Sequence, residues 1–394
     1  MRAIFLILIL NGLSLLHAQT LDIGLYTGTS IQQIDFSYLE GSYLIQADTS
    51  MYGAVLPNEF IAVIQLKSGK LLMRKGVKVI GHFDNIRLIP TGKDHAMRLR
   101  ARDPVLRERK YRDGFTIKNG DKGLKIINNV SYHHYLSGVI ESEGGAGRHV
   151  EYYKAQAVIS RTYAMKHAQR HASDGFSLCD QVHCQAYHNM MTYDDRIGQA
   201  VRSTAGVYMV DTVTNELVDG YFHANCGGQT SPSDYVWREG IPYLKTFRDT
   251  FCIYTSQATW EKKIPKLQWR RFLINNYFYP VADTTYGPQI YTFEQEERKA
   301  FYISPHLGIP LRDLRYHFKL KSTFFSCYPQ GKFVVLKGKG YGHGVGLCQE
   351  GAMRMAHEGV KYRQILSFYY DGIEFEHYFH RMYFEQDYLS PFDF

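Results

Sequence analysis

The segment from Tyr135 to Ala164 places the tightest constraint on the fold, because an apolar run, two glycines and a helix-forming run follow one another in it. The apolar run that leads to Glu143 predicts a strand, and Gly144 and Gly145 predict that the chain turns after it. The residues that follow predict a helix from about 150 to 172. A strand, a turn and a helix in this order commonly form one side of a cleft.

Glu143 is the candidate catalytic residue of this segment. A carboxyl group at the end of an apolar strand can be desolvated enough to hold its proton near neutral pH, as a general acid requires. Glu141 lies on the same face of the predicted strand and is either the second member of a catalytic pair or a charge at the rim. The structural alternative is that both carboxylates are solvated groups at the end of a strand.

The predicted helix carries polar candidates beside small residues. Ala157 and Ala164 share one face with Arg161, so we expect this guanidinium in the interior with a carboxylate as its partner. Such an ion pair would be either structural or functional. Lys154 and Gln156 lie on the same helix and, with Arg161, are candidates for substrate binding.

The N-terminus has the pattern of a secretory signal peptide. Arg2 gives a basic start, the run IFLILIL follows, and Ala18 is a small residue at the expected cleavage site. The apolar run is too short for a membrane span, and no cysteine follows Ala18 to accept a lipid. We therefore expect an exported protein with no membrane span once residues 1–18 are removed.

The charge balance narrows the class of partner. Lysine and arginine number 46 against 38 aspartates and glutamates, which gives a net charge of +8. A basic exported protein suits an acidic polymer or surface. The sequence contains no compact basic cluster or recognition motif for nucleic acid, so we expect no nucleic-acid partner.

The region from 19 to 110 predicts a β-rich structure. Apolar and polar residues alternate there in short runs, such as YLIQA at 43–47 and FIAVIQL at 60–66. The charged run at 101–113 predicts a solvated loop, and FTIKNGDKGLKII after it predicts a hairpin around Asn119 and Gly120. Aromatic residues make up 14% of the chain, which is typical of β-rich cores and also of sugar-stacking surfaces.

Cysteine and histidine residues crowd together directly after the predicted helix, at His171, Cys179, His183 and Cys184. Thiolate and imidazole groups suit tetrahedral zinc, although this spacing is irregular for a zinc finger. A disulfide between Cys179 and Cys184 and inert thiols are the alternatives. The chain has six cysteines, and export permits disulfides.

A glycine-rich loop, GKGYGHGVG at 338–346, precedes a predicted helix. Its glycines let the backbone approach a ligand closely, and His343 either donates hydrogen bonds to that ligand or is a structural loop residue. Cys226 and Cys348 lie in similar turns and are expected to face each other. They would form a disulfide, pack as thiols, or supply a nucleophile beside His343.

Taken together, these segments resemble the family of stage II sporulation protein D and LytB. The motifs that carry the resemblance, in order over residues 110–373, are YLSGVIESE, KAQAVISRTYA, CQAY, YFHANCGGQT, DYVW, GYGHGVGLCQEGAMRMA and QILSFYYDG. The resemblance implies an α+β fold, with a mixed strand-and-helix catalytic core and a β-rich N-terminal region. The expected divisions are a signal peptide at 1–18, a β-rich region at 19–110, the core at 111–375 and a tail at 376–394.

The resemblance also implies peptidoglycan as the substrate. The family's sporulation member is a lytic transglycosylase of glycan strands stripped of their peptides, and LytB-like members enhance cell-wall amidases. The family's catalytic glutamate falls on Glu143, and Lys154 and Arg161 match its helix positions. The cysteine and histidine cluster falls where the sporulation enzyme holds zinc, so the expected ligands are His171, Cys179 and Cys184.

The expected function is therefore an exported peptidoglycan lytic transglycosylase, periplasmic or extracellular, with Glu143 as general acid and base. The alternative is a non-catalytic, peptidoglycan-binding enhancer of a cell-wall amidase. Further substrate-binding candidates in the motifs are Gln156, Tyr221, His343 and Gln349. The chain departs from the family's pattern at Gly144 and Gly145, where Met-Pro is common, and at Asn225 and Cys226, where serines are common.

Overall fold

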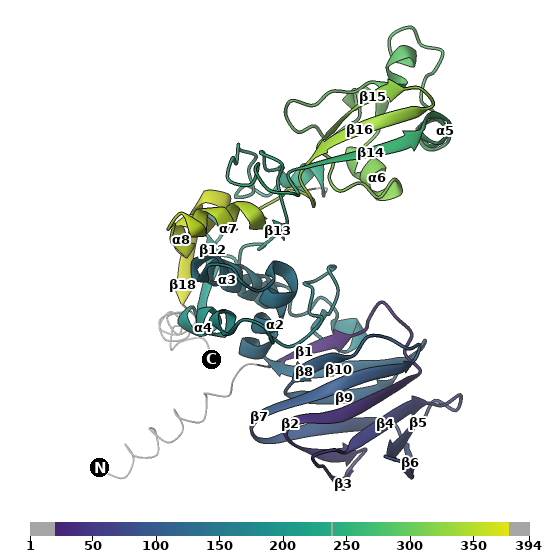
Figure 1. Ribbon diagram of the computed structural model, residues 1–394, viewed down its shortest axis with the longest axis vertical. Helices are drawn as coiled ribbons and strands as arrows, with labels where there is room; N and C mark the ends of the chain where they lie inside the picture. The colour runs from purple at the N-terminus through teal and green to yellow at the C-terminus, as the bar shows by residue number, and fades with distance from the viewer. Residues whose placement is uncertain (1–19, 238, 378–394) are drawn as a thin grey trace, which may run out of the picture. The chain divides into compact units, whose positions relative to one another are not determined.

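The computed structural model describes residues 20–237 and 239–377. The predicted signal peptide at 1–18 lies outside the described residues, as does the predicted tail at 376–394 except for its first two residues. The described residues divide into two compact units, one of residues 20–147 and 164–205 and the other of residues 148–163, 206–237 and 239–377. Figure 1 labels their helices and strands.

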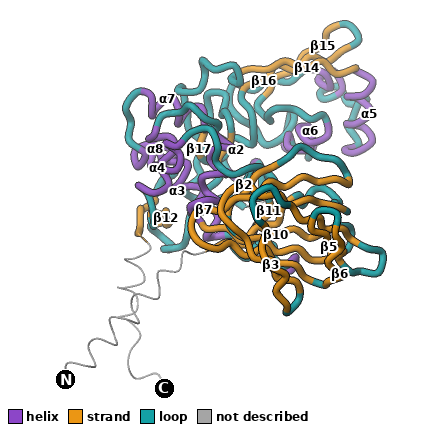
Figure 2. The backbone as a smooth tube through the Cα atoms, turned by 60° about the horizontal axis from the view of Figure 1, so that its bottom comes forward, coloured by secondary structure: helices purple, strands orange, loops and turns teal. Residues whose placement is uncertain are grey.

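The first unit is built on one large sheet. Its strands follow the order β11-β1-β10-β9-β7-β2-β4-β5-β6, with β3 beside β2 and β8 beside β7, and Figure 2 shows them gathered in orange. The strands are β1 (Thr20–Leu25), β2 (Gln33–Ala47), β3 (Ser50–Val55), β4 (Phe60–Gln65), β5 (Leu71–Lys75), β6 (Lys78–Phe83), β7 (Asn85–Asp103), β8 (Arg109–Arg112), β9 (Gly114–Asn119), β10 (Leu124–Ser131) and β11 (Leu178–Cys179).

The alternating pattern of the N-terminal region becomes this sheet. In β2, Ile34 and Phe36 lie opposite Val63 and Ile61 of β4, and all four side chains are buried. The predicted hairpin is confirmed, because β9 and β10 pair antiparallel across the turn that follows Asn119. With its helices, the structure confirms the α+β class and the β-rich N-terminal region.

The charged run at 101–113 is not the single loop that we predicted. β7 continues to Asp103, and β8 returns antiparallel to β7. The run forms strands because one side chain of β8, Tyr111, fills the core, while Arg100 and Glu108 pair at the surface at 2.8 Å. Strand pairing also satisfies the backbone amides of these residues.

The segment before Glu143 is a helix, α2 (Tyr132–Gly144), so the predicted strand is wrong. Ser131 caps this helix by accepting a hydrogen bond from the His134 amide at 3.3 Å. The buried face of α2 includes Tyr135, Leu136, Val139 and Ile140, a spacing that fits one side of a helix. Glu141 and Glu143 therefore do not share a face, as they would in a strand.

The predicted helix after the glycines is α3 (Val150–Lys166), and it ends earlier than expected. After the helix the chain returns to the large sheet, where Leu178 and Cys179 form β11 beside β1. A 3-10 turn at Ala172–Asp174 lies in this connection. α4 (Asp195–Ser203) follows, and the Asp194 side chain caps it.

The second unit combines small sheets with short helices. β12 (Val207–Asp211) pairs antiparallel with β18 (Ile373–His377), and β13 (Phe222–His223) pairs parallel with β17 (Leu347–Cys348). The other elements are β14 (Thr259–Pro265), α5 (Lys266–Tyr277), α6 (Leu311–His317), β15 (Phe325–Gln330), β16 (Phe333–Lys339), α7 (Gln349–His357) and α8 (Tyr362–Tyr369), with 3-10 turns at Ser233–Tyr235, Gly287–Tyr291 and Pro305–Leu307.

Aromatic side chains fill one core of the second unit. Trp269 and Phe272 of α5 and Leu314 of α6 pack with residues of the β14-β16-β15 sheet, and Figure 1 shows both helices beside these strands. Tyrosines are prominent among the large side chains that are fully buried, in both units. Much of the aromatic content therefore serves the cores.

Candidate functional site

Glu143 stands near the C-terminal end of α2, where the helix dipole disfavours negative charge. Its Oε1 atom accepts a hydrogen bond from the Ala186 amide at 2.7 Å. Burial raises the pKa of the Glu143 carboxyl above its usual value, and the hydrogen bond from Ala186 offsets this only in part. The carboxyl group is therefore disposed to hold a proton, which is what a general acid needs.

The glycines after Glu143 form a capped helix end. Gly145 has a φ of 71°, and its amide bonds to the Glu141 carbonyl; glycine adopts this conformation without strain. The Gly147 amide donates to Asp194 Oδ2 at 2.8 Å. Hydrogen bonds thus fix the backbone beyond Glu143.

Glu141 has a different environment from Glu143. Its two carboxylate oxygens accept the amides of Thr192 and Tyr193, each at 2.8 Å. Glu141 and Glu143 together hold the segment 186–193 at the end of α2. Because both oxygens of Glu141 are engaged, it acts as a clamp on this segment.

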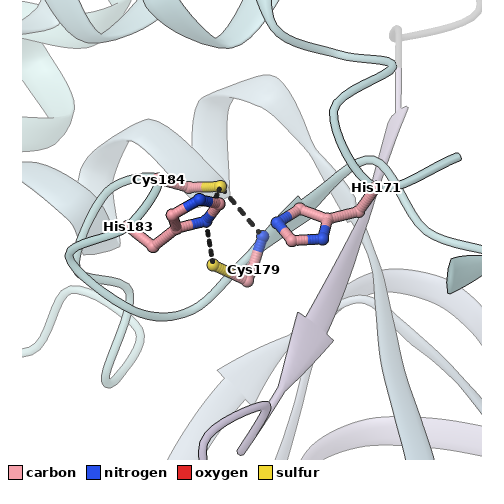
Figure 3. A group of neighbouring side chains, drawn as sticks. All are labelled: His171, Cys179, His183 and Cys184. Atoms are coloured by element: carbon pink, nitrogen blue, oxygen red, sulfur yellow. Dashed lines mark hydrogen bonds between the residues drawn. The ribbon is translucent and has the colours of Figure 1, made fainter. Parts of the chain in front are cut away.

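His171, Cys179, His183 and Cys184 come together in the first unit, as Figure 3 shows, and we call them the His171 cluster. One ligand atom from each lies within 4.8 Å of every other. His183 Nδ1 is 3.8 Å from the Sγ atoms of both cysteines, which are free thiols. A hydrogen bond from Cys184 lowers the pKa of the Cys179 thiol below its usual value.

The residues of the His171 cluster fit a zinc ion. His171 Nδ1 is bound to Asp174 Oδ2 at 2.8 Å, and in the described part of the chain its buried Nε2 atom has no hydrogen-bond partner. A carboxylate on one ring nitrogen orients the other toward a metal. Two thiols and two imidazoles are a common donor set of closed, structural zinc sites.

Lys154 lies on α3 in the second unit and pairs with a carboxylate of the same helix. Its Nζ atom donates to Glu151 Oε1 at 2.8 Å, and Glu151 Oε2 accepts the Tyr362 amide at 2.9 Å. The pair therefore links α3 to the start of α8. The role of Lys154 in substrate binding stays a prediction.

Gln156 and Arg161 are interior residues of α3. Gln156 is fully buried, and its Nε2 atom donates to Ser160 Oγ at 3.2 Å. Arg161 is buried as expected from its face of the helix, and its Nη1 atom donates to the Val207 carbonyl at 2.9 Å. Both side chains tie the second unit together, and their predicted contacts with substrate remain untested.

Tyr221 and His343 meet in the second unit around a third ring, Trp237. The ring centroids of Tyr221 and Trp237 are 4.4 Å apart with an interplanar angle of 30°, and those of Trp237 and His343 are 5.3 Å apart. All three side chains are half-buried. Such a surface offers apolar ring faces with polar edges, which suits a sugar ring.

Two histidines of this region are held neutral, His343 and its neighbour His223. Burial lowers the pKa of His343 to about 4, assisted by the charge of Arg315, and burial also lowers the pKa of His223. The Val345 amide donates to His343 Nδ1 at 3.1 Å, so the proton of His343 resides on Nε2. Neutral imidazoles can exchange hydrogen bonds with hydroxyl groups without adding charge.

Gln349 is the first residue of α7 and lies in the second unit. Its side chain is buried, and within the described residues its Nε2 atom has no hydrogen-bond partner. The buried Nε2 atom of His223 likewise has no hydrogen-bond partner among the described residues. Buried groups of this kind normally have partners, so a ligand is one explanation for both.

Cys226 and Cys348 lie together as expected. The Cys226 amide donates to Cys348 Sγ at 3.3 Å, and both side chains are fully buried. Cys226 Sγ also lies 3.3 Å from Cys252 Sγ. Because a buried thiol cannot reach a polymeric substrate, this arrangement does not favour a thiol nucleophile.

Sequence reasoning did not single out several of these residues. Trp237 was part of a family motif, and His183 was in the histidine and cysteine cluster, but neither became a site prediction. Cys252 is distant in sequence from Cys226 and Cys348, so no local pattern joins the three. Asp249 lies three residues before Cys252, in the segment DTFC, and this short spacing is the signal that could have found it.

Comparison with known proteins shows what this chain is similar to. A family model, SpoIID, described as stage II sporulation protein, matches residues 120–210. This match includes Glu143 and the whole His171 cluster. Together with the relatives described below, this match supports a relationship of the chain to the SpoIID/LytB family and confirms the resemblance seen in the motifs.

The chain is similar to three proteins in particular. An uncharacterized protein of Brachyspira hyodysenteriae is 28% identical over 254 residues, which cover 63% of this chain and 67% of the relative. Stage II sporulation protein D of Bacillus subtilis is 26% identical over 268 residues, or 63% of this chain and 75% of the relative. The amidase enhancer of Bacillus subtilis is 25% identical over 290 residues, or 60% of this chain and 39% of the relative.

Within residues 20–237 and 239–377, none of the helices has the length and apolar character needed to cross a membrane.

Proposed function

We propose that this protein is an exported lytic transglycosylase that cleaves the glycan strands of peptidoglycan, with Glu143 as its general acid and base. The observation that carries the proposal is the state of Glu143, whose pKa is raised by burial and whose position is fixed by the Ala186 amide. Glu143 lies inside the segment that matches the SpoIID family. The family and its relatives support a role related to the cell wall.

The proposed reaction uses one carboxyl group twice. Protonated Glu143 donates its proton to the glycosidic oxygen as the bond to the anomeric carbon breaks. The resulting carboxylate accepts the proton of the sugar's own 6-hydroxyl, whose oxygen closes an anhydro ring on that carbon. Because the nucleophile is part of the substrate, no second carboxylate has to activate water.

Peptide-stripped strands are the proposed substrate because they are anionic and consist of sugar rings that can stack on aromatic side chains. They carry free lactyl carboxylates, which suit the net charge of +8. The rings of Tyr221, Trp237 and His343 offer a surface for sugar stacking.

The His171 cluster would hold zinc as a structural ion. When bound, the ion would fix the thiolates and imidazoles in one geometry and so stiffen the loop that they share. Cys184 stands two residues before Ala186, whose amide binds Glu143. A rigid loop at Cys184 would therefore keep the Ala186 amide in place and orient the Glu143 carboxyl.

The test uses purified glycan strands with and without peptides, and mass spectrometry of the products. We expect anhydro-ended fragments from peptide-free strands with the wild type, and none above background with Glu143→Gln. Glu141→Gln is the matched control, because it changes the other carboxyl of α2 that accepts backbone amides. The proposal is wrong if wild type makes no anhydro ends, or if Glu143→Gln and wild type make them equally fast.

A second candidate function is supported by the similarity to the amidase enhancer of Bacillus subtilis. In this case the protein binds peptidoglycan and stimulates a cell-wall amidase without cutting glycan itself. The measurement is amidase activity with and without this protein. Stimulation that persists with Glu143→Gln, in the absence of anhydro products, would favour the enhancer.

A further inference from the structure

Three cysteines and one aspartate meet in the interior of the second unit, and we call them the Cys226 cluster. Its members are Cys226, Asp249, Cys252 and Cys348, and none of the four is exposed to solvent. They come from the turn after β13, from the loop that precedes β14, and from the N-terminus of α7. One ligand atom from each lies within 4.8 Å of every other.

We propose that the Cys226 cluster is a second metal site, closed to solvent, for a divalent cation that prefers thiolates, such as zinc. A tetrahedral zinc ion with bonds of about 2.3 Å to sulfur separates two sulfur atoms by about 3.8 Å. The Sγ atoms of Cys226 and Cys252 are 3.3 Å apart, and Cys226 Sγ is 3.3 Å from Asp249 Oδ2. Small shifts of the four side chains would place them around one ion.

Hydrogen bonds from backbone amides and from one tyrosine orient the ligand atoms of the cluster. Cys348 Sγ accepts the amides of Cys226 at 3.3 Å and of Gly351 at 3.4 Å. Asp249 Oδ2 accepts the hydroxyl of Tyr369 at 2.9 Å, and Asp249 Oδ1 accepts the Phe251 amide at 3.0 Å. Donors that point at sulfur and carboxylate oxygen are what metal ligands receive from their surroundings.

A buried arginine balances the charge of the proposed metal site. Three thiolates and a carboxylate around a divalent ion carry an excess of negative charge, which needs a positive neighbour in a dry interior. The buried guanidinium of Arg298 is next to the cluster, where its Nη2 atom donates to the Cys226 carbonyl at 2.6 Å. Its Nε atom donates to the Gln229 carbonyl at 2.8 Å, which fixes the group there.

A disulfide is the competing arrangement, because Cys226 and Cys252 are close. It would use two of the three sulfur atoms and leave the Cys348 thiol and the Asp249 carboxylate buried beside a neutral bond. The Sγ atom of Cys348 lies within 4.8 Å of the Sγ atoms of both other cysteines, so more than one pairing is within reach. A metal ion uses all four groups, and we therefore favour it.

The proposed ion would join the segments that carry the aromatic surface. In the β13-β17 pair, His223 lies opposite Cys348, and Tyr221 immediately precedes β13. The glycine-rich loop with His343 leads into β17. An ion at the Cys226 cluster would fix these segments together, whether or not the protein proves to be a transglycosylase.

The test measures metal content and thiol protection in the full chain, produced without chelator. A Cys179→Ser and Cys184→Ser double variant lacks the His171 cluster, so we expect it to retain about one equivalent of zinc. A Cys226→Ser and Cys252→Ser double variant should lose that equivalent. Cys327→Ser is the matched control, because Cys327 is a buried cysteine outside both clusters and its loss should leave the metal content unchanged.

A second measurement uses the wild type alone and does not depend on whether the variants fold. We expect Cys226, Cys252 and Cys348 to resist alkylation until a chelator is added. After chelation and denaturation, all three should react as free thiols. The proposal is overturned if the Cys179→Ser and Cys184→Ser variant folds and binds no metal. It is also overturned if peptide mapping without reductant finds Cys226 joined to Cys252 or Cys348.

Discussion

The amide of Ala186 donates a hydrogen bond of 2.7 Å to Oε1 of Glu143. This contact joins the loop of the His171 cluster to the candidate general acid, because Cys184 is two residues before Ala186. Within the described residues this is the hydrogen bond that the Glu143 carboxyl accepts, so its second oxygen is available to carry a proton. The proposed chemistry and the proposed zinc ion are therefore coupled through the short segment from Cys184 to Ala186.

The first prediction concerns the proposed catalytic carboxyl, Glu143. Glu143→Gln should lower the rate of anhydro-product formation by about 100-fold or more, since general acid and base catalysis contributes roughly that much. Glu141→Gln should stay within a few-fold of wild type, because its amide oxygen can still accept a backbone hydrogen bond. Product formation is measured by mass spectrometry, and equal losses in the two variants would contradict the assignment.

The second prediction concerns pH and stability. The pKa of Glu143 is raised in the folded protein by burial, so the folded state holds this proton more tightly than the unfolded chain. The contribution of Glu143 to stability is present below the usual pKa of glutamate and is lost as pH rises through the raised pKa.

Urea unfolding at several pH values, for wild type and Glu143→Gln, measures this contribution. The free energy of unfolding of wild type should fall relative to that of Glu143→Gln as pH increases across this range. Other titrating groups are common to both proteins and cancel in the difference. A difference that rises with pH would mean that the pKa of Glu143 is lowered rather than raised.

The third prediction concerns the proposed zinc at the His171 cluster. Cys184→Ser should lower the melting temperature and reduce the rate of product formation roughly 10- to 100-fold, because a misplaced Ala186 amide would no longer orient Glu143. Cys327→Ser serves as the control for loss of a buried thiol. If Cys184→Ser loses metal but keeps full activity, the ion does not position Glu143.

The fourth prediction concerns the aromatic surface. Trp237→Ala should weaken binding of glycan strands roughly 2- to 10-fold, the range expected for loss of an aromatic stacking contact. Trp237→Phe should bind more tightly than Trp237→Ala, because it keeps a ring. Sedimentation of the protein with insoluble peptidoglycan measures the binding, and unchanged binding by Trp237→Ala would rule out this surface.

The fifth prediction concerns the helix that carries Glu143. Ser131→Ala removes the cap of α2 and should lower the free energy of unfolding by about 1 kcal/mol, whereas Ser131→Asn should retain most of it. Urea unfolding measures both. Equal stability of Ser131→Ala and wild type would show that the cap contributes nothing to the fold.

The structure of α2 shows where sequence reasoning succeeded and failed. The apolar run that leads to Glu143 suggested a strand, because a short apolar run by itself does not distinguish a buried strand from a buried helix. Ser131 is a residue type that favours the N-cap position, and it was the local signal for a helix in this segment. Glu143 was still found, because its place before two glycines is the same in either conformation.

The sequence by itself determined the α+β class, the strands of the N-terminal region, the family resemblance and the identity of Glu143 as the candidate acid. The strands depend on local patterns, which are set by neighbours in the chain, and the other three depend on motifs and their order along the sequence. Only the tertiary structure decided that Ala186 contacts Glu143, that Trp237 joins Tyr221 and His343, and that Asp249 and Cys252 meet Cys226 and Cys348. Such contacts join residues far apart in the chain, and no local pattern encodes the packing that brings them together.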